Sequence, residues 1–316
     1  MKNPYIKWLA KLFMFIIALV AIDYFVGLAF DQLRDNSFEK NFLSQEFTCS
    51  YCVEKATPDV AIIGSSTANH HYIPSIMEDS LGLSVYNFGM DGCFFYFQNV
   101  LINLMLDRYS PSIIIWEIGE SSLSSAYDNH DEYQSMKLLY PWYSNTHVKK
   151  YIDNKDEFQK LRMLSACYRN NSDLLMYLRL GLGNSNTTLK GYSPLYNTKD
   201  YPSMKNSIKG SLNIVSQKID VLNQTIKRCQ EAGVTLVLTS SPRYFTNDVK
   251  STDYYHALKD IISKNNISFL DYYNSEPFCH DSTLFKDNAH MNNDGAVLYM
   301  SMFIPSLKQS LRDGLD

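Results

Sequence analysis

Apolar residues in this chain gather into short uninterrupted runs, separated by longer segments with the spacing of amphipathic helices. The runs that have the length and composition of buried strands lie at residues 59–63, 84–89, 112–119, 234–239 and 267–271. Helical spacing is clearest at 96–106 and 212–232, and the second segment ends at Gly233, a typical helix C-cap. Continuous apolar strands that alternate with helices predict an α/β fold, in which a parallel sheet is covered on both faces.

Residues 1–30 are predicted to form a signal anchor, that is, a transmembrane helix. The segment from Trp8 to Phe30 is apolar except for Lys11 and Asp23. A membrane-spanning helix needs about 20 predominantly apolar residues, and residues 12–30, with Asp23 near one boundary, are long enough to span. The uninterrupted core at 12–22 has the length of a signal peptide instead.

Charges and small residues around this segment bear on its orientation and its fate. Lys2 and Lys7 precede it, and positive charge on that side keeps the N-terminus in the cytoplasm. We therefore expect a membrane-anchored protein whose remaining residues lie outside the cytoplasm. Gly27-Leu28-Ala29 has the small-x-small pattern of a cleavage site, so a secreted form is the alternative.

Beyond the anchor we expect a linker at 31–57 and one α/β domain at 58–316. Residues 31–57 are polar, mixed in charge and without periodicity. The interval from about 120 to 209 interrupts the alternation of strands and helices and is rich in Tyr, Asn and Ser. Because this insertion is long and aromatic, it predicts a lid-like subdomain that shapes the substrate site.

Charge and cysteine content narrow the classes of partner. A formal net charge of -4 lacks the basic excess of a nucleic-acid-binding protein, so no nucleic-acid partner is expected. Among six cysteines, Cys49 and Cys52 form one C-x-x-C motif with no second pair or histidine cluster nearby. A local disulfide or free thiols fit that motif better than a zinc site does, and we expect neither a metal nor a cofactor.

The first strand run stops at Gly64-Ser65-Ser66, which predicts a turn at the carboxyl end of a strand. Ligands of open α/β sheets bind at such strand ends. Ser66 is therefore a candidate nucleophile, and the alternative is that it only caps the following helix. The neighbouring His70 and His71 are expected at the surface or at the rim of the site.

Another candidate group lies near the C-terminus, where Asp287 and His290 stand three positions apart. At that spacing a carboxylate is able to hold one imidazole nitrogen while the other nitrogen faces a substrate. With a serine, these two residues would complete a hydrolytic triad. Arg243, after the fourth strand run, is a candidate contact for an anionic group, and a solvated loop position fits it as well.

The order of these motifs resembles the SGNH, or GDSL-like, hydrolases, in which a Gly-Asp-Ser block comes first and Asp-x-x-His comes last. Gly64-Ser65-Ser66 matches the first block with Ser65 in place of the Asp, a replacement that occurs in branches acting on cell-envelope polymers. The last block continues with Met291-Asn292 and Gly295, as the family pattern does. The resemblance covers about 58–119 and 233–305.

The resemblance implies both a fold and the roles of the site residues. The fold would be a flavodoxin-like three-layer α/β/α sandwich with a mostly parallel five-stranded sheet. Ser66 would be the nucleophile, His290 its general base and Asp287 the group that orients His290. The oxyanion hole would contain the N–H groups of Ser66 and of Gly89, which lies in the second family block at 87–92.

The third family block differs from the usual Gly-x-Asn-Asp, since the chain reads Gly119-Glu120-Ser121-Ser122. Ser121 stands where the Asn amide would complete the oxyanion hole. Either its hydroxyl, the side chain of Asn69 or another group takes over that task, or activity is low. Loss of one oxyanion donor typically costs about 10²–10³ in rate.

These residues predict a serine esterase or O-acyltransferase that removes or transfers a small acyl group, such as acetyl, on a glycan outside the cytoplasm. Its partners would be an acylated glycan or an acyl donor, the membrane, and a membrane acyltransferase. The alternative, from another class, is a non-catalytic membrane-tethered relative that binds or presents an envelope polymer during its modification.

Overall fold

The computed structural model describes residues 3–38, 44–119, 122–125, 135–154, 158–171, 189–198, 214–244 and 248–313. The chain divides into two compact units, each with an architecture of its own. The first unit contains Met1–Phe47 and Met136–Asn186, and the second contains Thr48–Ser135 and Thr187–Asp316.

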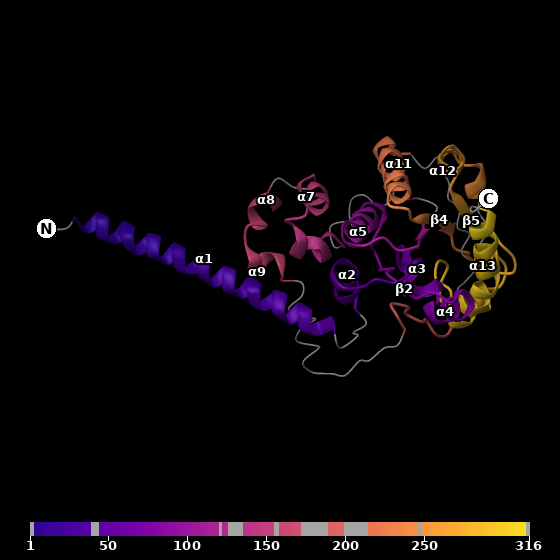
Figure 1. Cartoon of the computed structure of the whole chain (residues 1–316), viewed down its shortest axis with the longest axis horizontal. Coiled ribbons are helices and arrows are strands. Elements are labelled where there is room, and N and C mark those ends of the chain that lie inside the picture. Colours follow the sequence, from indigo (N-terminus) through magenta and orange to yellow (C-terminus); the bar gives the residue numbers. More distant parts are fainter. Residues whose placement is uncertain are drawn as a thin grey trace. The chain divides into compact units, whose positions relative to one another are not determined.

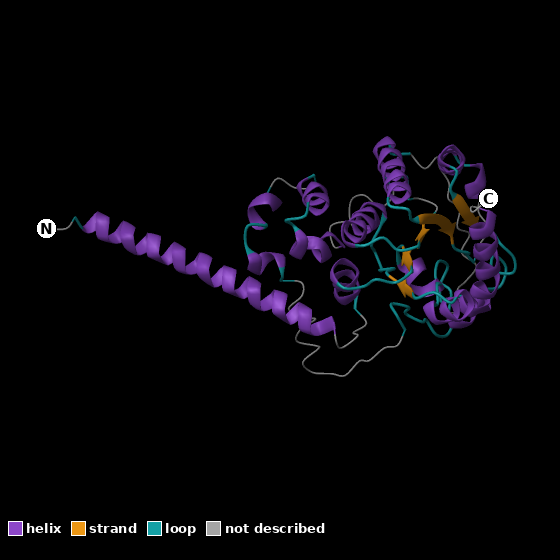
Figure 2. Ribbon diagram, viewed as in Figure 1, coloured by secondary structure: helices purple, strands orange, loops and turns teal. Residues whose placement is uncertain are grey.

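The second unit is built on a sheet of five parallel strands (Figure 2), namely β1 (Val60–Ile63), β2 (Val85–Asn87), β3 (Ile113–Glu117), β4 (Thr235–Ser240) and β5 (Ser268–Asp271). Their order is β2-β1-β3-β4-β5, which is that of the flavodoxin-like doubly wound sheets. The strand order reverses between β1 and β3, and ligands of such sheets bind beyond the carboxyl ends at that reversal. The predicted α/β fold is confirmed.

Helices cover both faces of this sheet (Figure 1). On one face α11 (Ser216–Glu231) packs against α5 (Phe95–Arg108) and α12 (Asp253–Asn265). On the other face α13 (Asn293–Asp313) packs against α3 (Ser66–His71) and α4 (Pro74–Leu81). This division follows from the strand order, because right-handed crossovers place the helices after β1 opposite those after β2, β3 and β4.

Alternate side chains along the strands fill two apolar layers. All residues of β1 and β3 are buried. Ile62 packs with Phe303 of α13 in the layer on one face. On the opposite face, Trp116 stacks on Phe95 with ring centroids 5.5 Å apart, and its Nε1–H donates to Gln98 Oε1 at 2.7 Å. The sheet is thus buried on both sides, as its continuous apolar runs predict.

The first unit contains a long apolar helix, α1 (Pro4–Ser37). The mean hydropathy of its most apolar window is 2.4, and by length and composition it is able to cross a membrane or to act as a signal sequence. The helix continues beyond the predicted anchor end at residue 30. Within the same unit, Arg34 donates to Asn170 Oδ1 at 3.3 Å and lies over the Trp142 ring, and these contacts stabilise the added turns.

Shorter helices complete the part of the chain that the structure describes. The first unit contains η2 (Lys137–Trp142), α7 (Thr146–Asp153), α8 (Gln159–Arg162) and α9 (Ala166–Arg169). These helices belong to the expected insertion at 120–209, of which Ser121 and much of the remainder lie outside the described residues. The second unit includes η3 (Asp248–Ser251) and η4 (Ser282–Leu284).

The expected linker at 31–57 contains helical structure. Besides the end of α1, it holds α2 (Gln45–Glu54). Arg108, at the end of α5, donates to the carbonyls of Cys52 and Val53 at 3.0 and 2.9 Å and so fixes the last turn of α2. Such side-chain contacts to carbonyls are not visible in local sequence.

Of the alternatives for the C-x-x-C motif, the structure has free thiols, since Cys49 and Cys52 are buried and unbridged.

Candidate active site

Ser66 stands at the carboxyl end of β1, where the strand turns into α3. The N-cap position of α3 is occupied by Ser65, whose backbone is extended and whose side chain makes no cap hydrogen bond. Ser66 is the first residue of the helix, so the alternative that Ser66 is the helix cap is wrong. The turn needs a glycine, because a Cβ at Gly64 would lie 2.5 Å from Ala68 Cβ and 2.9 Å from Glu117 Cβ.

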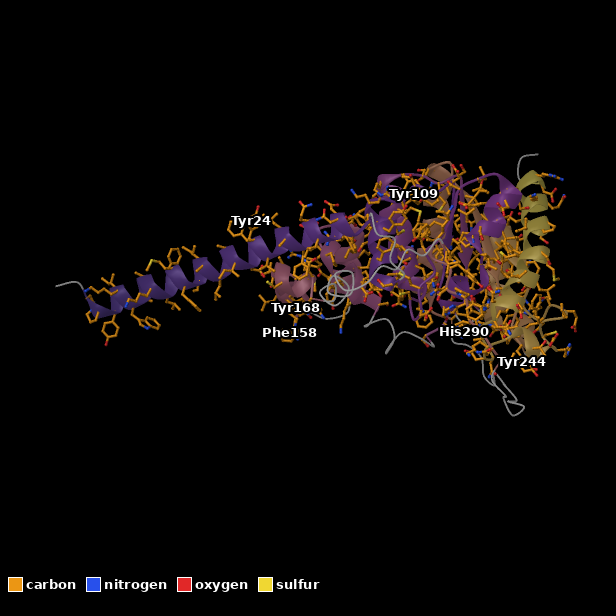
Figure 3. The ribbon with its side chains drawn as sticks, turned by 90° about the horizontal axis from the view of Figure 1, so that it is seen from below. Tyr24, Tyr109, Phe158, Tyr168, Tyr244 and His290 are labelled. Carbon is orange, nitrogen blue, oxygen red and sulfur yellow. The ribbon has the colours of Figure 1, made fainter. Side chains whose placement is uncertain are left out.

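The structure brings together the three residues of the predicted triad. His290 Nε2 lies 2.7 Å from Ser66 Oγ, although the two residues are 224 positions apart. His290 Nδ1 lies 2.9 Å from both carboxylate oxygens of Asp287. His290 is labelled in Figure 3, on the second unit. Serine, imidazole and carboxylate therefore form one continuous hydrogen-bonded line.

Asp287 is held as an ionised acceptor. Its Oδ1 also accepts the backbone N–H groups of Ala289 and His290, both at 2.9 Å. Burial by itself raises the pKa of this carboxyl, but the hydrogen bonds from the His290 ring and from these N–H groups outweigh burial and lower the pKa to about 2. An acceptor at Nδ1 means that this nitrogen carries the proton, so Nε2 is free to accept the Ser66 proton.

The loop that carries His290 is tied to the helix that carries Ser66. His71, at the end of α3, accepts the backbone N–H of Met291 at its Nε2, at 2.9 Å. His71 is fully buried, and burial together with nearby cationic groups lowers the pKa of its imidazole well below the usual value. It is therefore neutral and able to accept. The expectation that His71 lies at the surface or at the rim of the site is wrong. Two adjacent histidines in a sequence give no indication of their tertiary partners.

His70 is buried as well, and its ring contacts that of His290. Its Nδ1 lies 2.6 Å from the Ser193 carbonyl and its Nε2 lies 3.4 Å from Asp91 Oδ1. Burial alone would lower the pKa of this imidazole, but these two acceptors reverse the effect and raise it. The ring stands edge-on to His290 with centroids 5.4 Å apart.

The buried carboxyl group of Glu117 stabilises the turn at Ser65 and Ser66 through hydrogen bonds. Glu117, the last residue of β3, is 2 % exposed and accepts the Thr67 hydroxyl at 2.6 Å. The Ser65 hydroxyl lies 3.1 Å from Thr67 Oγ1, and since Thr67 donates to Glu117, Ser65 donates to Thr67. An aspartate at position 65 would place a second carboxylate beside Glu117, and like charges at short range disfavour each other. The neutral Ser65 fits this chain's own network.

The predicted oxyanion donors are only partly brought to the site. The N–H of Ser66 lies in the first turn of α3, where helix N–H groups have no intrahelical partner. The N–H of Gly89 donates instead to Asn87 Oδ1 at 2.8 Å. The Asn69 amide donates to Asp91 Oδ1 at 3.0 Å. Ser121 lies outside the described residues, so its predicted role stays a prediction.

Ser66 and His290 open onto a pocket of about 200 Å³. Its described lining also includes two aromatic residues, Phe94 and Phe95, and two cationic ones, Lys218 and Arg243. The described lining residues include no Asp or Glu, so the fixed charge of this described part of the wall is positive.

The two cations are held by carbonyl groups of the second unit. Lys218 is 2 % exposed, its Nζ donates to the Ser124 carbonyl at 2.6 Å, and it lies 5.1 Å from the centre of the Tyr96 ring. Arg243 Nη1 donates to the Ala289 carbonyl at 2.9 Å and thereby supports the His290 loop. The sequence does not mark Lys218 as a site residue, because a lysine within a helical segment carries no sign of burial.

One cluster in the described part of the chain has the composition of a metal site. The ligand atoms of Glu276, Cys279 and His280 lie within 4.8 Å of one another. Glu276 and His280 are exposed, and their side chains already pair at 2.7 Å. None of the three lines the pocket, so the cluster is no part of the Ser66 site.

The chain matches no family model and no curated protein. Among solved structures it is similar to a putative acylhydrolase from Bacteroides fragilis, with 12% identity and a TM-score of 0.42, over 88% of this chain and 100% of that one. It is also similar to a gut microbial diltiazem-metabolizing enzyme, with 13% identity and a TM-score of 0.39, over 78% of this chain and 46% of that one. At these identities and TM-scores, the likeness gives no evidence about activity. Evidence about activity comes from the geometry of the site.

The close approach at Gly64 gives a prediction about stability. We expect Gly64→Ala to lower the free energy of unfolding by about 1–3 kcal/mol, because the added methyl group overpacks the contact of α3 with β3. The measurement is denaturant unfolding of the full-length protein in detergent. Gly119→Ala is the control, since its Cβ would meet only ordinary contacts at 3.8 and 3.9 Å. Equal stability of the two variants would contradict the prediction.

Proposed function

We propose that this protein is a serine esterase or O-acyltransferase that acts through Ser66, His290 and Asp287. The observation that carries the proposal is the unbroken line from Ser66 Oγ to His290 Nε2, at 2.7 Å, and from His290 Nδ1 to Asp287, at 2.9 Å. A serine hydroxyl is a weak nucleophile unless a base is in hydrogen-bond contact with it, and this contact is present before any substrate binds.

In the proposed reaction, His290 Nε2 takes the proton of Ser66 Oγ while that oxygen attacks an ester carbonyl. The ionised Asp287 stabilises the imidazolium that forms, and the Ser66 N–H donates to the oxyanion. As the tetrahedral intermediate collapses, His290 returns its proton to the leaving alcohol and the acyl group stays on Ser66. Water or a sugar hydroxyl then repeats the sequence, which gives hydrolysis or transfer.

The volume and the charge of the pocket favour a substrate that carries a small acyl group and a negative charge. Its volume of about 200 Å³ is below the roughly 300–1,000 Å³ of sites for drug-sized ligands, so a short acyl group such as acetyl fits. Lys218 and Arg243 make the wall cationic, and a carboxylate or phosphate on the substrate is the complementary group. We propose an acylated acidic glycan outside the cytoplasm as the substrate, because Lys2 and Lys7 before α1 favour that orientation.

One observation favours a second candidate function. Since Asn87 takes the N–H of Gly89, the described residues offer the oxyanion fewer donors than the resemblance implies. A tethered protein that binds the polymer and presents it to a membrane acyltransferase needs the pocket but not the oxyanion hole. The intact hydrogen-bonded line through His290 favours the enzyme over this alternative.

Labelling by a fluorophosphonate separates the two functions. We expect the full-length protein in detergent to be labelled, because the probe reacts only with an activated serine, and Ser66→Ala to remove the label. Asp287→Asn should slow labelling strongly, since the corresponding change in a serine protease triad costs about 10⁴ in kcat. Ser65→Ala is the matched control and should still be labelled. Folded protein that neither reacts with the probe nor hydrolyses a small acetyl ester would exclude the catalytic proposal.

The charge of the pocket gives a separate prediction. We expect Lys218→Met to lower kcat/KM for an acetylated uronic acid by about 10–100-fold, because a hydrogen bond to a charged group contributes about 1.5–3 kcal/mol. Activity on a neutral acetylated sugar should stay nearly constant. Lys227→Met, on an exposed position of the same helix, is the control. Parallel losses on both esters would show that Lys218 acts on the fold and not on substrate charge.

A further inference from the structure

The carboxylate of Asp23, in the apolar part of α1, accepts hydrogen bonds from residues at the N-terminus of α9. Asp23 Oδ1 accepts the Ser165 hydroxyl at 2.6 Å and the Cys167 N–H at 2.9 Å, and its Oδ2 accepts the Ala166 N–H at 2.7 Å. The first N–H groups of a helix have no partner within it. Asp23 thus supplies, from another segment, the acceptors that α9 needs at its N-terminus.

The face of α1 that carries Asp23 is shaped to receive α9. Gly27, one turn later, is buried, and a Cβ there would lie 2.7 Å from Ala166 Cβ. Arg34, further along the same face, bonds Asn170 at 3.3 Å. Figure 1 shows α9 beside the later turns of α1, within the first unit. These contacts make the second half of α1 an integral part of a folded unit.

The segment that leads into α9 exposes large apolar side chains. Phe158, Leu161 and Leu164 are 70%, 69% and 73% exposed, although they lie within one short stretch of a folded unit. Phe158 is labelled in Figure 3, as is Tyr24 of α1. Lys160 and Arg162 are exposed among them. Apolar side chains interleaved with cations are typical of segments that lie at the boundary of lipid tails and phosphate head groups.

The length of α1 places this segment at membrane depth. The rise of about 1.5 Å per residue puts Asp23 about 22 Å from Trp8, and the hydrocarbon core of a bilayer is about 30 Å thick. If the core begins at Trp8, as an aromatic at the interface suggests, Asp23 lies about 8 Å short of the far boundary. A carboxylate at that depth has no water and requires protein donors. The start of α9 supplies them, so α9 must lie at the same depth.

We propose that residues 158–170 form a membrane-embedded platform with α1, in which Phe158, Leu161 and Leu164 contact the lipid tails of one leaflet. The occupant of this apolar surface is the bilayer, because the surface continues directly from a helix long enough to span it. Two consequences follow. The protein is held by more than a single helix, and α1 is retained, because cleavage at 27–29 would remove the three acceptor contacts of Asp23. This inference does not depend on the proposed catalysis.

Depth-resolved quenching tests the platform. A fluorophore is attached to Leu164→Cys in a Cys167→Ser background, where the remaining cysteines are buried, and the full chain is placed in phospholipid vesicles. We expect lipids brominated in their acyl chains to quench the label, and aqueous iodide to quench it weakly. The same label at Lys227→Cys, an exposed site of the second unit, should respond in the opposite way. Free access of iodide to the label at 164 overturns the proposal, and so does protection from both quenchers, which would mean a protein partner.

The bond to Asp23 is tested by substitution. Asp23→Leu keeps α1 apolar but removes the acceptors, so we expect iodide access at the 164 label to rise toward that of the control at 227. Asp23→Asn keeps one acceptor oxygen and should show a smaller rise. Intact mass of the wild-type protein from membranes should include residues 4–30. A mature chain that begins after residue 29, or an Asp23→Leu variant with unchanged quenching, overturns the inference.

Discussion

The hydrogen bond between Ser66 Oγ and His290 Nε2 joins two segments that only the sheet brings within reach of each other. Ser66 depends on β1, whose buried residues end at Gly64, and His290 depends on a loop after β5 that α13 secures. His71 accepts the N–H of Met291, and Arg243 donates to the Ala289 carbonyl, so the two halves of the site are tied by their neighbours as well. The site is preorganised because its supporting contacts are made by the fold and not by a ligand.

Charge is distributed around this bond in a consistent way. Asp287 is ionised and fixes the proton on Nδ1 of His290, while the buried His71 stays neutral. Glu117 is linked to the serine turn by hydrogen bonds through the neutral hydroxyls of Thr67 and Ser65. The pocket wall, by contrast, carries the positive charge of Lys218 and Arg243. The carboxyl groups of Asp287 and Glu117 thus support His290 and the serine turn, while the described pocket lining carries the two cationic side chains.

The first unit raises a different physical problem, namely an acidic residue in an apolar helix. Taken alone, Asp23 weakens the case that α1 spans a membrane, because an unpaired carboxylate is expensive in lipid. Its three hydrogen bonds to residues 165–167 remove that objection. On the proposed membrane platform, the same bonds also account for the exposed apolar residues next to α9, since a segment that bonds a carboxylate within the bilayer would itself contact lipid.

Local patterns in the sequence determined much of the fold and half of the site. Runs of buried strand residues, their alternation with helices, and the turn at Gly64 are set by short-range sterics and by periodicity, so the parallel sheet and the position of Ser66 were predictable, as was the pairing of Asp287 with His290 at three residues' distance. The roles of Glu117, His71 and Lys218, and the loss of the Gly89 donor to Asn87, were not. The first three depend on partners 50 to 220 positions away, and the fourth depends on the Asn87 side chain, whose amide donates to the carbonyls of Ala68 and Tyr72. Only tertiary packing decides which of these polar groups lose water and which hydrogen bonds replace it.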